Sequence, residues 1–118
     1  MARSVLVVDD DPAFRELAGR LLTAAGLKVA GQADCAAAAI DAANALKPDA
    51  ALVDVGLPDR DGISLAQDLT ALPWRPRVVL TSVDADVARL GDVRRSGACA
   101  FMHKAELPHG LPRLLGSS

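Results

Sequence analysis

The sequence is poor in aromatic residues: it has no tyrosine, and Phe14, Trp74 and Phe101 are its only aromatic side chains. A surface that stacks nucleic-acid bases needs several such side chains. Basic residues are also scattered, with Arg94 and Arg95 as the only adjacent pair, whereas nucleic-acid-binding domains gather theirs in a patch or stripe. We therefore expect no direct binding of nucleic acid by this segment.

Long apolar runs are missing as well. No stretch approaches the roughly 18 apolar residues of a membrane span, and the run over residues 5–8 is too short for a signal peptide. Only two cysteines occur, Cys35 and Cys99, and their spacing does not suggest a metal site. We expect both to be buried as small apolar side chains. Together these features predict a soluble, cytoplasmic protein that does not contact a membrane.

What the chain does have is enough apolar sequence for one core, at 51% of its 118 residues. We expect one domain over residues 1–118. Short apolar runs alternate with helix-period segments, a pattern typical of strand–helix–strand units. The central runs are continuously apolar, which indicates parallel strands covered on both faces. The sequence thus predicts an α/β fold, a doubly wound five-stranded parallel sheet with strands at residues 5–8, 28–32, 50–53, 78–80 and 98–102.

The segments between these runs have the period and the boundary residues of helices. Asp11 followed by Pro12 predicts a helix start with Asp11 as its cap, and Gly26 predicts its end. Asp59 and Asp61 are interpreted as turn residues. Further helices are expected at residues 34–46, 63–72 and 84–96, with a short or broken one after Leu107 because of the prolines there.

Polar residues follow the strong apolar runs. In a parallel sheet these positions meet at one edge, outside the carboxyl ends of the strands, where open α/β sheets bind ligands. Four separate segments are therefore expected to contribute to one pocket, through Asp9 and Asp10, Asp54, Thr81 and Ser82, and Lys104.

The chemistry of such a pocket follows from its charges. Clustered carboxylates repel one another unless a cation offsets them, and Mg²⁺ and Lys104 are the candidates. Mg²⁺ is commonly held by one or two carboxylates together with phosphate oxygens, so a phosphate-bearing substrate is implied. A carboxylate can also act as a nucleophile and form an aspartyl phosphate, and Asp54 occupies the central position. As an isolated residue, Asp54 would be interpreted more readily as a cap.

Five segments of the sequence carry a resemblance to a known family. They are VVDDDP from Val7, LVDVGLP from Leu52, Asp61-Gly62, LTS from Leu80 and FMHK from Phe101. In this order and spacing the chain resembles the response-regulator receiver family over nearly its whole length, and residues 97–108 are similar to the NarL/FixJ subgroup. Receivers of this kind have a flavodoxin-like sheet with strand order 2-1-3-4-5.

The resemblance implies a role for each residue of the site. Asp54 would accept a phosphoryl group from the phosphohistidine of a sensor histidine kinase. Mg²⁺ would be ligated by Asp10, Asp54 and the backbone carbonyl of Gly56, with Asp9 acting indirectly. Lys104 would pair with the phosphoryl group.

The resemblance also implies how the signal leaves the site. The Thr81 hydroxyl would move to bond the phosphoryl group, and Phe101 would act as an aromatic switch. A face made of the fourth helix, fifth strand and fifth helix would then control an output domain or partner protein. The resemblance also implies control of transcription and a homodimer on phosphorylation. The helix-turn-helix output domain usual in the subgroup is not expected within this chain. Ala105 stands where many receivers have a proline.

Two other functions are compatible with parts of the sequence. A phosphatase or phosphotransferase of the haloacid-dehalogenase type also forms an aspartyl phosphate, but it carries a second acid two residues later, where this chain has Gly56. A phosphorylation-independent interaction module would have lost the acids or Lys104. We therefore expect a signalling switch, and not an enzyme that turns over an external substrate.

Overall fold

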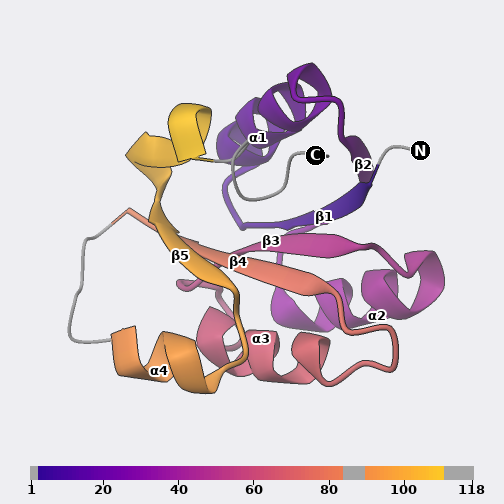
Figure 1. Cartoon of the computed structure of the whole chain (residues 1–118), viewed down its shortest axis with the longest axis vertical. Coiled ribbons are helices and arrows are strands. Elements are labelled where there is room, and N and C mark those ends of the chain that lie inside the picture. Colours follow the sequence, from indigo (N-terminus) through magenta and orange to yellow (C-terminus); the bar gives the residue numbers. More distant parts are fainter. Residues whose placement is uncertain (1–2, 84–89, 111–118) are drawn as a thin grey trace.

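The structure, a computed structural model, describes residues 3–83 and 90–110. Its centre is a five-stranded parallel sheet in the order β2-β1-β3-β4-β5 (Figure 1). Both the predicted strand order and the parallel arrangement are confirmed. The strands are Ser4–Val8 (β1), Lys28–Ala33 (β2), Ala50–Asp54 (β3), Arg77–Ser82 (β4) and Ala100–His103 (β5).

Side chains of the central strands are buried on both faces of the sheet. In β1, Leu6 and Val8 belong to the core shared with α2, α3 and α4, whereas Val5 and Val7 belong to the core shared with α1. Because successive side chains of a strand point to opposite faces, a strand buried on both faces is apolar at every position. This explains the continuous apolar runs.

Helices lie on both faces of the sheet. Helix α1 lies on one face, and α2, α3 and α4 lie on the other (Figure 1). Their bounds are Pro12–Ala24 (α1), Ala36–Leu46 (α2), Gly62–Thr70 (α3) and Leu90–Arg95 (α4). The predicted start of the fourth helix, residues 84–89, lies outside the described residues.

Helix α1 begins as the sequence predicts. Asp11 has an extended backbone, its carboxylate accepts a hydrogen bond from the Ala13 amide at 3.0 Å, and Pro12 occupies the first helical position. Gly26, with φ of 85°, follows the helix end in a left-handed conformation that favours glycine. Within the described ranges, no helix is both long enough and apolar enough to cross a membrane.

Three expectations need correction or restriction. The fifth strand begins at Ala100 and not at residue 98, because Gly97 adopts a positive φ and the Ala98 amide is bound by the Ser96 hydroxyl. Cys99 is exposed and Cys35 only partly buried, so the prediction of two buried cysteines was wrong. The chain is helical over residues 107–110, after a 3₁₀ turn at Lys104–Glu106, and the rest of the predicted fifth helix lies outside the described residues.

Candidate functional site

The register of the sheet brings the predicted site residues to one edge. Val8 pairs with Val53, Asp54 with Thr81, and Ser82 with His103, so the carboxyl ends of β1, β3, β4 and β5 are level. Asp9 and Asp10 follow β1 directly, and Lys104 follows β5. The predicted convergence of four segments on one pocket is therefore present in the structure.

Three carboxylates form the acidic part of this pocket. One oxygen from each of Asp9, Asp10 and Asp54 lies within 4.8 Å of the others. Asp9 and Asp54 are buried, whereas Asp10 is exposed at the mouth. A set made only of carboxylate oxygens suits a hard divalent cation that retains water ligands. These three residues fit a site for such a cation.

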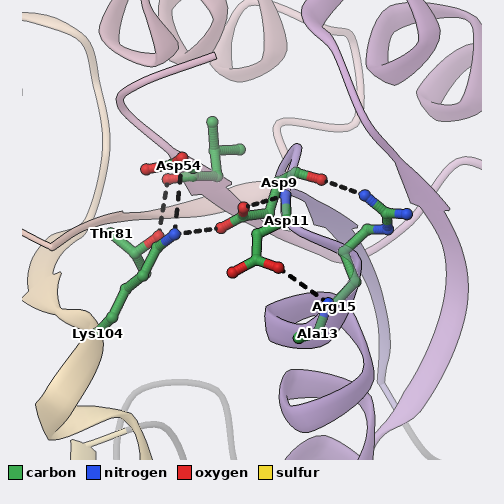
Figure 2. A network of polar contacts seen from close by, with 8 residues as sticks. Asp9, Asp11, Ala13, Arg15, Asp54, Thr81 and Lys104 are labelled. Atoms are coloured by element: carbon green, nitrogen blue, oxygen red, sulfur yellow. Dashed lines mark hydrogen bonds and ion pairs between the residues drawn. The ribbon is translucent and has the colours of Figure 1, made fainter. Parts of the chain in front are cut away.

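Asp9 is completely buried and is held from two sides (Figure 2). Its Oδ1 accepts a hydrogen bond from the Asp11 amide at 2.9 Å, and its backbone carbonyl accepts one from the Arg15 guanidinium at 2.6 Å. Its Oδ2 lies 2.7 Å from the Lys104 Nζ. Among the described residues this oxygen has no hydrogen-bond donor of ordinary geometry, so the ion pair is its charge compensation.

Asp54 ends β3 with only 8% of its surface exposed. Burial raises the pKa of its carboxyl above the ordinary aspartate range, and the Asp9 carboxylate raises it further. The Lys104 ammonium, with Nζ 3.7 Å from the Asp54 Oδ2, and a hydrogen bond from the Gly56 backbone oppose this shift. A cation bound between the carboxylates would favour the ionised form of Asp54, which is the nucleophilic one.

Lys104 reaches between the two buried carboxylates (Figure 2). Its side chain is only 14% exposed, and its Nζ also lies 4.4 Å from the centroid of the Phe14 ring on α1. The face of an aromatic ring attracts an ammonium group. The lysine is thus directed into the site by two carboxylates and by a ring that sequence reasoning had not connected with it.

The predicted switch residues lie near the site, in defined positions. Thr81 is fully buried beside Asp54 in the sheet, and its hydroxyl lies 3.4 Å from the Val53 carbonyl, to which it donates. Phe101 is half-buried, pairs with Leu80 in the sheet and packs against the core under α2, α3 and α4. Ser82 is buried at the end of β4.

The loop after β3 is fixed against the backbone of Asp54. The Val55 amide donates to the Thr81 carbonyl at 2.9 Å, and the Gly62 amide donates to the Val55 carbonyl at 3.0 Å. A Cβ at Gly62 would lie 2.1 Å from the Asp54 carbonyl oxygen, so only glycine permits this approach of α3. Asp61 caps α3 through the Ile63 amide at 2.8 Å, as expected for a residue at a turn.

The loop after β5 has a local hydrogen bond that a proline would prevent. The Ala105 amide donates to the Nδ1 of His103 at 3.0 Å and caps the 3₁₀ turn that contains Lys104. Proline has no amide hydrogen to donate. The alanine at this position therefore permits a hydrogen bond from its backbone amide to the side chain of His103, the residue before Lys104.

Comparison with known proteins places this chain in a family. The sequence model of the response regulator receiver domain matches residues 5–114. A transcriptional regulatory protein of Mycobacterium tuberculosis, NarL, is 37% identical over 101 residues, which are 85% of this chain and 47% of that protein. The chain thus spans about half the length of this relative. The chemotaxis protein CheY of Thermotoga maritima is 28% identical over 92% of this chain and 90% of its own length.

A solved structure agrees with these matches. The signal receiver domain of the response regulator NarL from Mycobacterium tuberculosis superposes with a TM-score of 0.83 at 32% sequence identity, covering 93% of each chain. The predicted resemblance to the receiver family, including the NarL-like subgroup, is confirmed.

Proposed function

The chain belongs to the response regulator receiver domain family of two-component signalling, and from this premise we propose that Asp54 is its phosphoryl acceptor. The observation that carries the proposal is the position of Asp54 between two opposing influences. It lies in a cluster with the buried Asp9 and the exposed Asp10, and the Lys104 Nζ lies 3.7 Å from its Oδ2. A nucleophile that must approach a phosphoryl group needs this balance of carboxylate and cationic charge.

In the proposed reaction the donor is the phosphohistidine of a sensor histidine kinase. An Asp54 carboxylate oxygen attacks the phosphorus, a P–O bond forms as the P–N bond breaks, and the bonding electron pair returns to the imidazole. Lys104 neutralises negative charge on the phosphoryl oxygens at the position where its Nζ already lies. Only 8% of the Asp54 surface is exposed, so few water molecules can reach the carboxylate that attacks.

The proposed cation is Mg²⁺, held by Asp10, Asp54 and the Gly56 backbone carbonyl, with Asp9 acting indirectly. When bound, it would neutralise charge on the carboxylates and on the phosphoryl oxygens. Two features support Mg²⁺ at this site: all the side-chain ligands are oxygens, and one carboxylate oxygen from each of the three aspartates lies within 4.8 Å of the others. Asp9 is held in place because both its carboxylate oxygens and its backbone carbonyl already have partners. This is why it is assigned an indirect role.

The proposed output runs from Thr81 to the face that contains α4 and β5. The Thr81 hydroxyl would leave the Val53 carbonyl, its long 3.4 Å contact, and bond the phosphoryl group. Phe101 would change rotamer in response, and an output domain or a second copy of the chain would bind the altered face. This chain spans about half the length of the M. tuberculosis relative, which is a transcriptional regulatory protein. We therefore propose that the chain controls transcription as part of a longer protein.

The test is to incubate the protein with a small phosphodonor and Mg²⁺ and to measure its mass. We expect one phosphoryl adduct in the parent and none in Asp54→Asn, while Asp49→Asn, at the other end of β3, forms the adduct like the parent. Absence of the adduct in the parent, or its persistence in Asp54→Asn, contradicts the proposal. Rapid multiple-turnover release of phosphate from small monoesters would instead favour the phosphatase alternative.

A further inference from the structure

Asp59, which the sequence suggests is an ordinary turn residue, connects two parts of the fold. It lies in the loop after β3, five positions beyond Asp54, and its side chain is exposed. Its Oδ1 accepts a hydrogen bond from the Ala36 amide at 2.8 Å and its Oδ2 accepts one from the Ala37 amide at 3.0 Å. Both donors belong to the first turn of α2, more than twenty residues earlier in the chain.

These bonds supplement a weak cap at the start of α2. The residue at the cap position is Cys35, whose sulfur accepts from the Ala38 amide at 3.5 Å, and a thiol is a weak acceptor. The first amides of a helix need partners from outside the helix, and a carboxylate there also interacts favourably with the helix dipole. The two amide bonds lower the pKa of the Asp59 carboxyl, which keeps it ionised.

The same bonds fasten the loop that carries Gly56. Before Gly56, the Val55 amide is tied to Thr81. After it, Leu57 is buried in the core, and Asp59 follows two residues later with its carboxylate on α2. Gly56 itself bonds to the Asp54 carboxylate through its backbone. The proposed cation ligand therefore lies on a short segment that is anchored on both sides.

We propose that Asp59 is a positioning residue for the divalent-cation site. Its two hydrogen bonds to the first turn of α2 fix the segment that carries the Gly56 carbonyl. This inference rests on the proposed function, in which Gly56 is a cation ligand. Ordering this segment in advance removes an entropy cost that cation binding otherwise has to meet. The cation site and the start of α2 are then coupled, and the coupling is reciprocal.

The alternative hypothesis is that Asp59 only stabilises α2. To distinguish the two roles, the Mg²⁺ affinity of the whole chain is measured by calorimetry. The backbone amide NMR shifts of Ala36 and Ala37 are followed during the same Mg²⁺ titration. Asp59→Ala removes both acceptors. Asp59→Asn keeps one oxygen acceptor in place of two.

Two variants serve as matched controls. Ala45→Gly weakens α2 at an exposed position of its last turns and leaves Asp59 in place. Asp41→Asn removes one negative charge from an exposed position of the same helix. Neither touches the loop after β3.

We expect Asp59→Ala to raise the Mg²⁺ dissociation constant about fivefold or more. The dissociation constant of Asp59→Asn should lie between those of Asp59→Ala and the parent. Both control variants should bind Mg²⁺ like the parent. The phosphorylation rate of Asp59→Ala should recover at saturating Mg²⁺. In the parent, Mg²⁺ should shift the Ala36 and Ala37 amide signals, and in Asp59→Ala this response should be lost.

Parent-like affinity in Asp59→Ala, or an equal loss in Ala45→Gly, overturns the inference and leaves the proposed function standing. A parent protein that binds no Mg²⁺ overturns the proposed cation site itself, and the inference with it.

Discussion

The two ends of strand β3 carry aspartates in opposite surroundings. Asp49, just before the strand, is exposed, and its Oδ2 accepts hydrogen bonds from the Ser4 amide at 2.8 Å and the Ser4 hydroxyl at 3.3 Å. Its own amide donates to the Ser4 carbonyl at 3.0 Å. Asp54, at the other end, is buried beside another carboxylate, and these surroundings raise its pKa.

The different surroundings of the two residues indicate that Asp49 is a structural aspartate and Asp54 a reactive one. Asp49 joins the amino ends of β1 and β3 and has solvent and neutral donors around it, so its charge is easily accommodated. Asp54 lies where its charge is costly unless a cation is present. Groups whose surroundings disfavour their charged form are concentrated at functional sites. Substitutions at one end of β3 at a time test this difference.

The largest effect is expected when the ammonium group of Lys104 is removed from the carboxyl edge of the sheet. Lys104→Met should slow phosphoryl uptake from a small phosphodonor about 100-fold, because the charge on the phosphoryl oxygens loses its ammonium partner. Rates of adduct formation by mass spectrometry measure this. Lys28→Met, at the exposed start of β2, is the control, and an equal loss there would contradict a local role for Lys104.

A smaller but clear effect is expected at the mouth of the acidic cluster. Asp10→Asn should weaken Mg²⁺ binding at least about tenfold, because one of the three clustered carboxylates is lost. Calorimetric titration measures the affinity. Asp11→Asn removes the neighbouring charge but keeps a good helix cap, so its affinity should stay near that of the parent; equal losses would indicate a general charge effect.

At the amino end of β3 the expected effect is on stability alone. Asp49→Ala should lower the free energy of unfolding by about 1 kcal/mol, because the Ser4 amide and hydroxyl lose their acceptor. Urea denaturation measures this change. Phosphoryl uptake under folding conditions should be unchanged, and a loss of uptake would mean that the two ends of β3 are not independent.

The smallest effect is expected at Asp54 in the absence of divalent cations. Because the pKa of Asp54 is raised in the folded state, ionising this carboxyl destabilises the fold. The destabilisation is absent at pH below the unfolded-state pKa and reaches its full size above the folded-state pKa. Asp54→Asn should therefore raise the melting temperature by a few degrees at neutral pH, and the gain should vanish in acid. A lower melting temperature in Asp54→Asn at neutral pH would contradict the account. Mg²⁺ should stabilise the parent more than this variant.

Sequence reasoning located the site because its position follows from topology. Once the apolar runs are parallel strands, Asp9, Asp54 and Lys104 must lie at one edge, and the structure brings them within ion-pair distance. The cap at Asp11 was predictable for a similar reason, since it acts only on its own helix. Roles for Asp54, Gly56, Thr81 and Phe101 in phosphorylation remain predictions.

What the sequence could not show depends on side chains that meet across the fold. The contact of Phe14 with Lys104, the bond from Arg15 to the Asp9 carbonyl and the link from Asp59 to α2 join segments whose relative placement is set by packing. Phe14 has the helix period of a core residue, and nothing in its spacing indicates a cation above its ring.

The central claim is that Asp54, and no other carboxylate of the cluster, forms the bond to phosphorus. Its most direct test is to phosphorylate the protein with a small phosphodonor and Mg²⁺, reduce the acyl phosphate with borohydride, and map the product by peptide mass spectrometry. Reduction converts a phosphorylated aspartate to homoserine. The account predicts homoserine at position 54 alone, whereas homoserine at Asp9 or Asp10, or its absence throughout, would contradict it.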